Sequence, residues 1–213
     1  KKELNVCGKC QRKTFMYITK EQKRIKKLEK EVVRLKELAY KDELTTLYNR
    51  RGFKEESARL IYEIIGCLAN PSRRQNFLIK SFSLVIFDID NFKKINDSYS
   101  HQAGDAVLKL VGRIIKDRAR GIDVVARWGG DEIIVGLVGS DKNHAYKIAD
   151  DIRKNVEEAT VNWKNKTMKV TISGGVADFT HVKDFESLFK KADEALYKAK
   201  QTDKNKIVKA SDL

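Results

Sequence analysis

Apolar residues recur with heptad spacing through the first forty residues of the chain. Residues 17–41 contain no Gly or Pro, so a helix can run through them without interruption. The a and d positions are occupied by Ile18, Ile25, Leu28, Val32, Leu35 and Ala39. Isoleucine or valine at a with leucine at d favours parallel two-stranded pairing, so we expect residues 1–41 to form a dimerising coiled-coil helix. The alternative is a single amphipathic helix packed on its own domain.

Beyond residue 41, strand-like apolar runs alternate with amphipathic helical segments. The predicted helices cover residues 51–68, 104–119, 142–159 and 184–200. The predicted strands cover residues 82–88, 123–127, 132–138, 167–177 and 206–208, with a tight hairpin at Gly129-Gly130. Interleaved strands and helices indicate a second domain, residues 42–213, of α/β class, in which helices pack on a sheet.

The distribution of charge weakens the first impression of a nucleic-acid-binding protein. The 213-residue chain has 44 Lys and Arg against 30 Asp and Glu, a formal net charge of +14. Residues 1–41 hold 14 of the basic and 5 of the acidic residues, which places +9 on the expected coiled-coil helix. A basic nucleic-acid-binding module remains an alternative. It lacks an interleaved aromatic surface and any recognition motif, so we expect no nucleic-acid partner.

Cysteine usage and hydropathy indicate the cellular compartment. Cys7, Cys10 and Cys67 are too few and too unevenly spaced for a disulfide framework, which favours a reducing cytoplasm. Cys7 and Cys10 make one CxxC, which is half of a zinc site or simply two incidental thiols. No apolar run reaches the roughly 20 residues of a membrane span and no signal-peptide pattern is present, so no membrane contact is expected. The start at Lys1 rather than Met suggests a fragment whose sensor domain lies upstream.

Acidic residues cluster where predicted strands end. The four are Asp88, Asp90, Asp131 and Glu132. Oxygen ligands of this kind suit Mg²⁺, and two such ions can activate an attacking oxygen and stabilise a leaving one. Gly129 and Gly130 are expected to permit φ > 0 in the hairpin and a close approach of phosphate to the backbone. Solubilising loop acids are the alternative interpretation for any one of these residues.

Six segments together resemble one family, the GGDEF-domain diguanylate cyclases. They are DELTTLYNRRGF (42–53), FDIDNFKKIND (87–97), HQAGDAVL (101–108), RGIDVVARWGGDE (120–132), VTISGGVA (170–177) and ADEALYKAKQTDKN (192–205). The resemblance implies a palm-like α+β fold with a central, mostly antiparallel sheet flanked by helices. It also implies condensation of two GTP molecules into cyclic di-GMP and two pyrophosphates.

The resemblance implies a role for each matching residue. Asp88, Asp131 and Glu132 match the catalytic and metal-binding acids, and the carbonyl of Ile89 is a further ligand for two Mg²⁺ (or Mn²⁺) ions in each half-site. Asp131 is the candidate to help deprotonate the 3′-hydroxyl. The substrate-binding residues for guanine are Asn96 and Asp105. Those for the phosphates are Phe92 and Lys93, which lie on a turn, together with Lys200 and Lys204. A carboxylate at Asp105 accepts from N–H groups that adenine does not present together.

Arg120 and Asp123 match the inhibitory product site of the family. Arg120 is expected to present its fork to cyclic di-GMP, and Asp123 to accept from the base. A surface salt bridge is the alternative for this RxxD pair.

The sequence departs from the family pattern at several positions. These are Ile133 for Phe, Ser100 for Gly, Gly174 for an apolar residue, Lys204 for Arg, and a longer loop over residues 66–80. Ile133 should change packing more than chemistry. Lys204 keeps the charge but loses the bidentate fork of arginine, so GTP affinity or orientation is expected to suffer.

The product has two phosphodiester links, so two GTP-loaded domains must face each other in a homodimer. The N-terminal helix is expected to pair them and to transmit upstream signals. Two alternatives share the fold: a silent GGDEF domain that only binds nucleotide, and another nucleotidyl cyclase or polymerase. The intact acids argue against the first, and Asp105 against the second.

Overall fold

A computed structural model describes residues 8–69, 81–182 and 184–210, which form two compact units, Lys1–Ala39 and Tyr40–Leu213. The first unit consists of most of helix α1 (Gly8–Tyr40). Four of its heptad side chains, Ile25, Leu28, Val32 and Leu35, are 50–56% exposed. An exposed heptad seam is available for pairing, and the coiled-coil dimer stays a prediction. No helix in the described ranges is long and apolar enough to cross a membrane.

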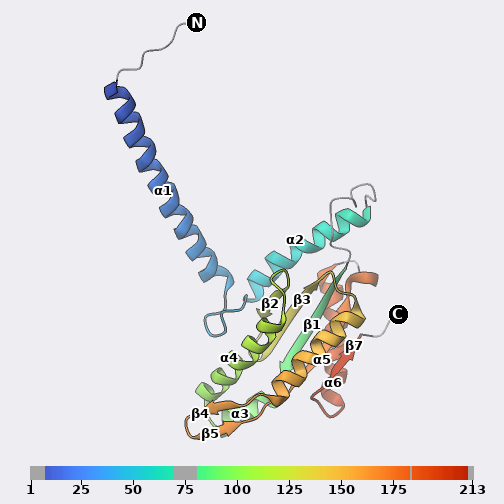
Figure 1. Cartoon of the computed structure of the whole chain (residues 1–213). Helices are drawn as coiled ribbons and strands as arrows, with labels where there is room; N and C mark the ends of the chain where they lie inside the picture. The colour runs from blue at the N-terminus through green and yellow to red at the C-terminus, as the bar shows by residue number, and fades with distance from the viewer. Residues whose placement is uncertain (1–7, 70–80, 183, 211–213) are drawn as a thin grey trace. The chain divides into compact units, whose positions relative to one another are not determined.

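The second unit is built on a five-stranded sheet of order β2-β3-β1-β6-β7 (Figure 1). The strands are β1 (Phe82–Ile89), β2 (Val124–Arg127), β3 (Glu132–Val138), β6 (Ile172–Asp178) and β7 (Ile207–Lys209). All neighbours pair antiparallel except β6 and β7, which are parallel. The predicted α/β fold with a mostly antiparallel sheet is therefore confirmed.

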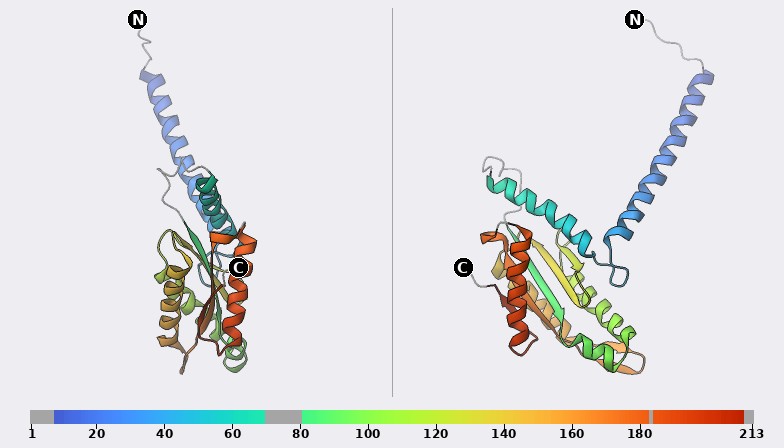
Figure 2. Two further views of the ribbon diagram at one scale, coloured as in Figure 1. Left: turned by 90° about the vertical axis from the view of Figure 1, so that its right-hand side faces the viewer. Right: turned by 180° about the vertical axis from the view of Figure 1, so that it is seen from behind.

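Helices cover both faces of this sheet (Figure 2). The helices are α2 (Arg50–Ala69), α4 (His101–Arg118), α5 (Lys142–Glu158) and α6 (Phe185–Gln201). Alternate residues of β1 enter different cores: Leu84 and Ile86 pack with α2 and α6, while Val85 and Phe87 pack with α4 and α5. Every residue of β1 is buried, so a carboxylate at its last positions leaves bulk water.

The predicted strand 167–177 is wrong as a single element. Its first part is β5 (Lys166–Met168), which forms a separate hairpin with β4 (Val161–Trp163), and its second part is β6. Met168, Val170 and Ile172 are all buried across the break, so the apolar alternation continues although the strand changes its pairing partner. The hydrophobic pattern alone does not show this change.

A short helix, α3 (Phe92–Ser98), follows β1 where the sequence analysis expected a turn. Asn91 adopts a left-handed conformation (φ 58°), which reverses the chain and starts the helix at once. Helix α4 starts at His101, three residues earlier than predicted, because the Ser100 side chain caps the backbone N–H of Ala103. Cys7 and residues 70–80 lie outside the described residues. The predictions about the CxxC pair and about the longer loop over residues 66–80 therefore stay untested.

Candidate active site

Hydrogen bonds from the Arg127 side chain hold the glycine hairpin between β2 and β3 in place. The Nε and Nη2 of Arg127 donate to the carbonyl of Gly130 at 3.1 and 2.8 Å, and its Nη1 lies 3.2 Å from Asp42. Asp42 also accepts from the backbone and hydroxyl of Thr45. These contacts tie the hairpin to the segment where the second unit begins.

The expected positive φ at Gly129 and Gly130 is wrong. Among the described glycines, only Gly139 has a positive φ. A Cβ on Gly129 would instead lie 2.9 Å from Oε2 of Glu132, whereas one on Gly130 would meet nothing within 4 Å. The glutamate carboxylate therefore lies close over the backbone of Gly129, and a side chain at this position would displace it.

Trp128 anchors the base of the hairpin in an aromatic cluster. Its ring lies 5.0 Å from Phe189 and 6.1 Å from Phe53, measured between centroids. The guanidinium of Arg50 stacks 4.5 Å from the Trp128 ring centroid. Arg50 was not among the predicted site residues, although its place in the first matching segment was a signal.

Three predicted acids meet at the ends of β1 and β3. Asp88 is paired in register with Glu132, and the N–H of Ile89 donates to the Asp131 carbonyl at 3.3 Å. Asp88 is buried, and Lys200 Nζ contacts its Oδ2 at 2.5 Å. Burial, with added repulsion from Asp131 and Glu132, raises the pKa of Asp88 to about 6 although Lys200 opposes the shift.

The pKa of Glu132 is raised as well, first by burial and then by the charges of Asp131 and Asp193. Glu132 lines a cleft of about 510 Å³ that also contacts Asp193, Tyr197 and Lys200 on α6. Negative charge is thus concentrated beside an opening large enough for a small ligand.

The donor set fits a hard cation that arrives with its substrate. No three His, Cys, Asp or Glu side chains among the described residues are placed to hold a metal by themselves. Mg²⁺ usually takes one or two carboxylates together with substrate phosphates, so a closed protein cage is not required. The ammonium of Lys200 already sits against Asp88, which shows that positive charge is favoured there. Asp88, Glu132 and neighbouring carbonyl oxygens therefore suit the ion.

Asp90, two residues from Asp88, has a structural role. It is buried and accepts from the hydroxyls of Thr171 and Ser173, each at 2.7 Å, and from the backbone of Asn205 at 3.0 Å. These bonds use both carboxylate oxygens. Asp90 fastens the end of β1 to β6 and to the turn after α6, so it is not available as a ligand.

The turn at residues 203–205 places Lys204 beside the end of β1. Its three residues all have left-handed backbone conformations, with φ of 64°, 57° and 46°. Lys204 Nζ donates to Oδ1 of Asn91 at 2.7 Å. Lysine rarely adopts this conformation, and the bond from Asn205 to Asp90 holds the turn in it. Lys204 is therefore fixed where the sequence analysis expected phosphates.

The predicted guanine-reading residues lie on α3 and α4. Oδ1 of Asn96 is buried and has no hydrogen-bond partner within the described part of the chain. A Cβ on Gly104 would collide with this oxygen and would lie 3.1 Å from Cζ of Phe92, so glycine makes room for both side chains. Asp105 is exposed one residue further along α4. A buried, unused acceptor beside an exposed carboxylate is suited to a ligand with adjacent N–H donors.

Phe92 and Lys93 open α3 instead of lying in a turn. Phe92 is half-buried against the core beside α4. The side chain of Lys93 is exposed and has no bonding partner among the described residues. Their part in phosphate binding stays a prediction.

Arg120 and Asp123 form a closed pair at the other end of β2. Oδ2 of Asp123 accepts from the backbone and Nε of Arg120 at 2.8 and 3.0 Å, while Oδ1 accepts from Arg120 Nη2 and the Val138 backbone, each at 3.0 Å. The Asp123 side chain is 2% exposed and that of Arg120 is 50% exposed. Asp123 therefore orients the Arg120 side chain, and both of its carboxylate oxygens already accept hydrogen bonds within the chain.

Comparison with known proteins identifies the family to which the second unit is similar. Residues 39–206 match the sequence profile described as "Diguanylate cyclase, GGDEF domain". The chain is 42% identical over 129 residues to diguanylate cyclase A of Treponema denticola, covering 60% of this chain and 35% of that protein. It is 34% identical over 191 residues to diguanylate cyclase DgcM of Escherichia coli K12, covering 89% and 42%. The chain thus spans well under half the length of these relatives.

Solved structures show the same fold. The GGDEF domain of DgcB from Caulobacter crescentus, in complex with c-di-GMP, superposes with a TM-score of 0.72 at 28% identity, covering 82% of this chain and 94% of that one. The GGDEF domain of PA1120 from Pseudomonas aeruginosa gives a TM-score of 0.70 at 31% identity, covering 81% and 95%.

Proposed function

The chain belongs to the GGDEF-domain family of diguanylate cyclases, and we propose that it joins two GTP molecules into cyclic di-GMP with release of two pyrophosphates. The observation that carries the proposal is the pairing of Asp88 with Glu132 at the glycine hairpin, where burial and the charge of Asp131 raise both pKa values. Such crowding costs stability unless a cation and its substrate use it.

Asp88, Asp131, Glu132 and the Ile89 carbonyl would hold two Mg²⁺ or Mn²⁺ ions. When bound, the ions supply positive charge beside the reacting phosphate and lower the pKa of the attacking hydroxyl. Asp131, at the tip of the hairpin, accepts the proton of the 3′-hydroxyl. The new bond joins this oxygen to the α-phosphorus of the second GTP, and pyrophosphate leaves in line.

Asn96 and Asp105 select guanine over adenine. The unused Oδ1 of Asn96 can accept a hydrogen bond from the base, and Asp105 can accept from N1–H and the exocyclic amine together. Adenine lacks N1–H and an amine beside it, so it cannot satisfy the Asp105 carboxylate in this way. Lys200 and Lys204 neutralise the phosphates, with Phe92 and Lys93 nearby, and Lys200 exchanges its contact with Asp88 for one with phosphate.

Synthesis of a cyclic dinucleotide requires two loaded domains facing each other. The exposed heptad seam of α1 supports pairing through this helix. Removing residues 1–40 should make specific activity fall steeply on dilution, because the domains must then meet by diffusion. Equal dilution behaviour with and without the helix would contradict this role.

Arg120 binds the product at a second site and slows the enzyme. The half-exposed guanidinium, oriented by Asp123, keeps donors free for a guanine edge or phosphate. In Arg120→Ala, initial turnover should persist while progress curves no longer flatten as cyclic di-GMP accumulates. If cyclic di-GMP inhibited this variant and the unaltered chain equally, the Arg120–Asp123 pair would be only a structural salt bridge.

The proposed activity is tested by incubating the pure chain with GTP and Mg²⁺ and identifying the product by mass. Cyclic di-GMP and two equivalents of pyrophosphate are expected. GTP binding without product would show instead a silent domain that acts as a receptor, and a linear dinucleotide would show another nucleotidyl transferase.

A further inference from the structure

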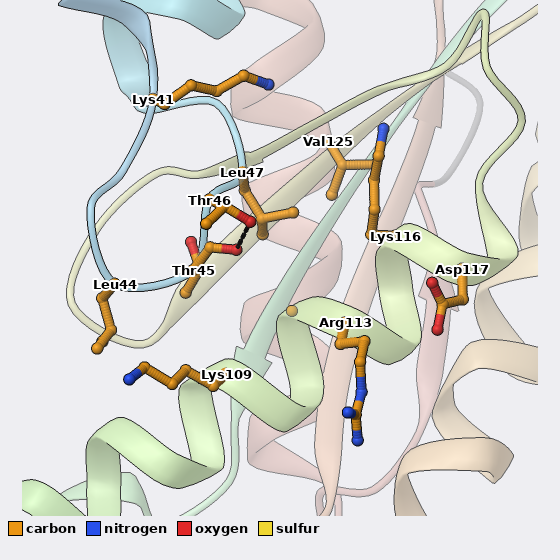
Figure 3. Close-up of a pocket in the computed structure, with 11 residues that line it drawn as sticks. Lys41, Leu44, Thr45, Thr46, Leu47, Lys109, Arg113, Lys116, Asp117 and Val125 are labelled. Carbon is orange, nitrogen blue, oxygen red and sulfur yellow. Dashed lines mark hydrogen bonds between the residues drawn. The ribbon is translucent and has the colours of Figure 1, made fainter. Parts of the chain in front are cut away.

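A basic cavity of about 360 Å³ lies between the 41–47 loop and one face of α4 (Figure 3). Four of its lining residues are basic and one is acidic: Lys41, Lys109, Arg113 and Lys116 against Asp117. None of the carboxylates of the glycine hairpin lines it. The cavity is therefore distinct from the candidate active site and opposite to it in charge.

Helix α4 shapes the floor of this cavity. Lys109, Gly112 and Lys116 are spaced i, i+3 and i+7, which places them on one helical face. Gly112 leaves a gap between the two lysines, and the loop covers it so closely that a Cβ there would lie 3.3 Å from Cδ1 of Leu47. In Figure 3, Lys109 extends toward Leu44, whereas Lys116 extends upward beside Val125, so the two side chains leave the helix in different directions.

The cations on this face lack acidic partners. Lys109, Arg113 and Lys116 form no ion pair within the described residues. Several arginines elsewhere in the same unit are paired with carboxylates, among them Arg118, Arg120, Arg127 and Arg153. Like charges three and four residues apart destabilise a helix, so an unpaired basic face costs stability unless an anion neutralises it.

The loop at the mouth of the cavity is conformationally strained. Thr46 has a φ of 61°, a left-handed conformation that β-branched residues strongly disfavour. Its hydroxyl donates to the Thr45 carbonyl at 2.6 Å, and Thr45 in turn is bonded to Asp42. Strain of this kind persists where the surroundings hold it, and it often marks a binding site. Here it keeps two hydroxyl oxygens beside the basic face.

We propose that this cavity binds an extended phosphorylated anion, a polyphosphate or the phosphate tail of a nucleotide. Lys109 and Lys116 are separated by about 10 Å along the helix axis and their side chains extend in different directions, so a chain of phosphates suits the pair better than a single phosphate does. Arg113 at the rim offers a fork suited to phosphate oxygens. The ligand would contact the loop whose Asp42 holds Arg127, and through Arg127 the carbonyl of Gly130.

The test is calorimetric titration of the whole chain with tripolyphosphate in EDTA, which keeps metal out of the glycine hairpin. Two double variants remove the same charge: Lys109→Gln with Lys116→Gln in the cavity, and Lys200→Gln with Lys204→Gln at the substrate side. The cavity variant should lose at least about 10-fold in affinity, clearly more than the substrate-side control, which removes only phosphate contacts at the active site. Amide signals of Thr46 and Gly112 should shift on titration in the unaltered chain.

Several outcomes would overturn the proposal. These are an absence of binding, an equal loss in both double variants, or tight binding of a decaglutamate peptide with none of tripolyphosphate. The last would identify an acidic protein segment as the occupant. A parallel titration with ATP shows which source of phosphate is used. If ATP and tripolyphosphate bind with equal affinity, the cavity recognises phosphates alone. If ATP binds more tightly, the apolar lining of the cavity also holds a base. Loss of cyclase activity bears on neither result, because binding is measured without metal.

Discussion

Asp123 and Asp88 are both buried carboxylates in the same sheet, yet their surroundings are opposite. Asp123 accepts four hydrogen bonds, three from Arg120 and one from the Val138 backbone. Asp88 contacts one ammonium group and faces two further acids. A buried charge whose acceptors are all used suits a positioning role, whereas crowded acids are typical of a site of chemistry. The surroundings alone thus distinguish Asp123, which positions Arg120, from Asp88, which lies in the candidate active site.

The largest expected effect follows from removing a crowded acid. Asp131→Ala should lower the rate of cyclic di-GMP synthesis by at least about 10²–10³-fold, because it removes a group beside the reacting oxygens. The free energy of unfolding should change by less than about 0.5 kcal/mol, since Asp131 contributes little to the core. Turnover and thermal melting of the same preparation check both statements. Near-normal turnover would move the chemistry elsewhere.

Asp123→Ala should instead lower the free energy of unfolding. It leaves the Val138 N–H without its acceptor and Arg120 without its partner, so we expect about 2–4 kcal/mol of destabilisation, discounted for the exposure of Arg120. Asp151→Ala, which breaks the exposed pair with Arg118, is the matched control and should cost about 0–1 kcal/mol. Urea denaturation of both variants measures the difference, and equal costs would contradict the account.

The raised pKa of Asp88 predicts how stability depends on pH in EDTA. The folded pKa is about 6 and the ordinary value is 3.8, so the folded chain binds a proton here that the unfolded chain has released. This contribution is fully present below pH 3.8 and is lost as pH rises through 6, a change of about 3 kcal/mol at 1.36 kcal/mol per unit. Asp88→Asn should flatten the fall in melting temperature between pH 4 and 7. Identical slopes in both proteins would mean that Asp88 is not crowded.

Ser100 extends the comparison from charge to backbone strain. Its φ of 151° and ψ of 164° lie in a region used almost only by glycine, while its hydroxyl caps α4. Ser100→Gly should stabilise the chain by about 1 kcal/mol, because relief of strain exceeds the few tenths lost with the cap. Ser100→Ala keeps the strain and loses the cap, so it should destabilise. Melting temperatures that move in the same direction would refute this balance.

The order of helices and strands was predictable because apolar periodicity and the glycine hairpin act locally. The separation of Asp88 from Asp90 was not, since the partners that satisfy Asp90, among them Thr171 and Asn205, are 81 and 115 residues away. Helix α3 was missed because seven residues are too short for a clear period. The reason for Gly129 also depends on a carboxylate folding back over it, a contact that residue spacing does not show.

The central claim is that the crowded acids, and not the satisfied pair, hold the metal with GTP. The direct measurement is amide NMR of the chain with 3′-deoxy-GTP, which cannot condense, during addition of paramagnetic Mn²⁺. The account predicts early broadening of the signals of Ile89, Asp131 and Glu132, while those of Asp123 and Val138 stay sharp. Broadening at Asp123 and Val138 first, or equal broadening at both ends of β2, would contradict it.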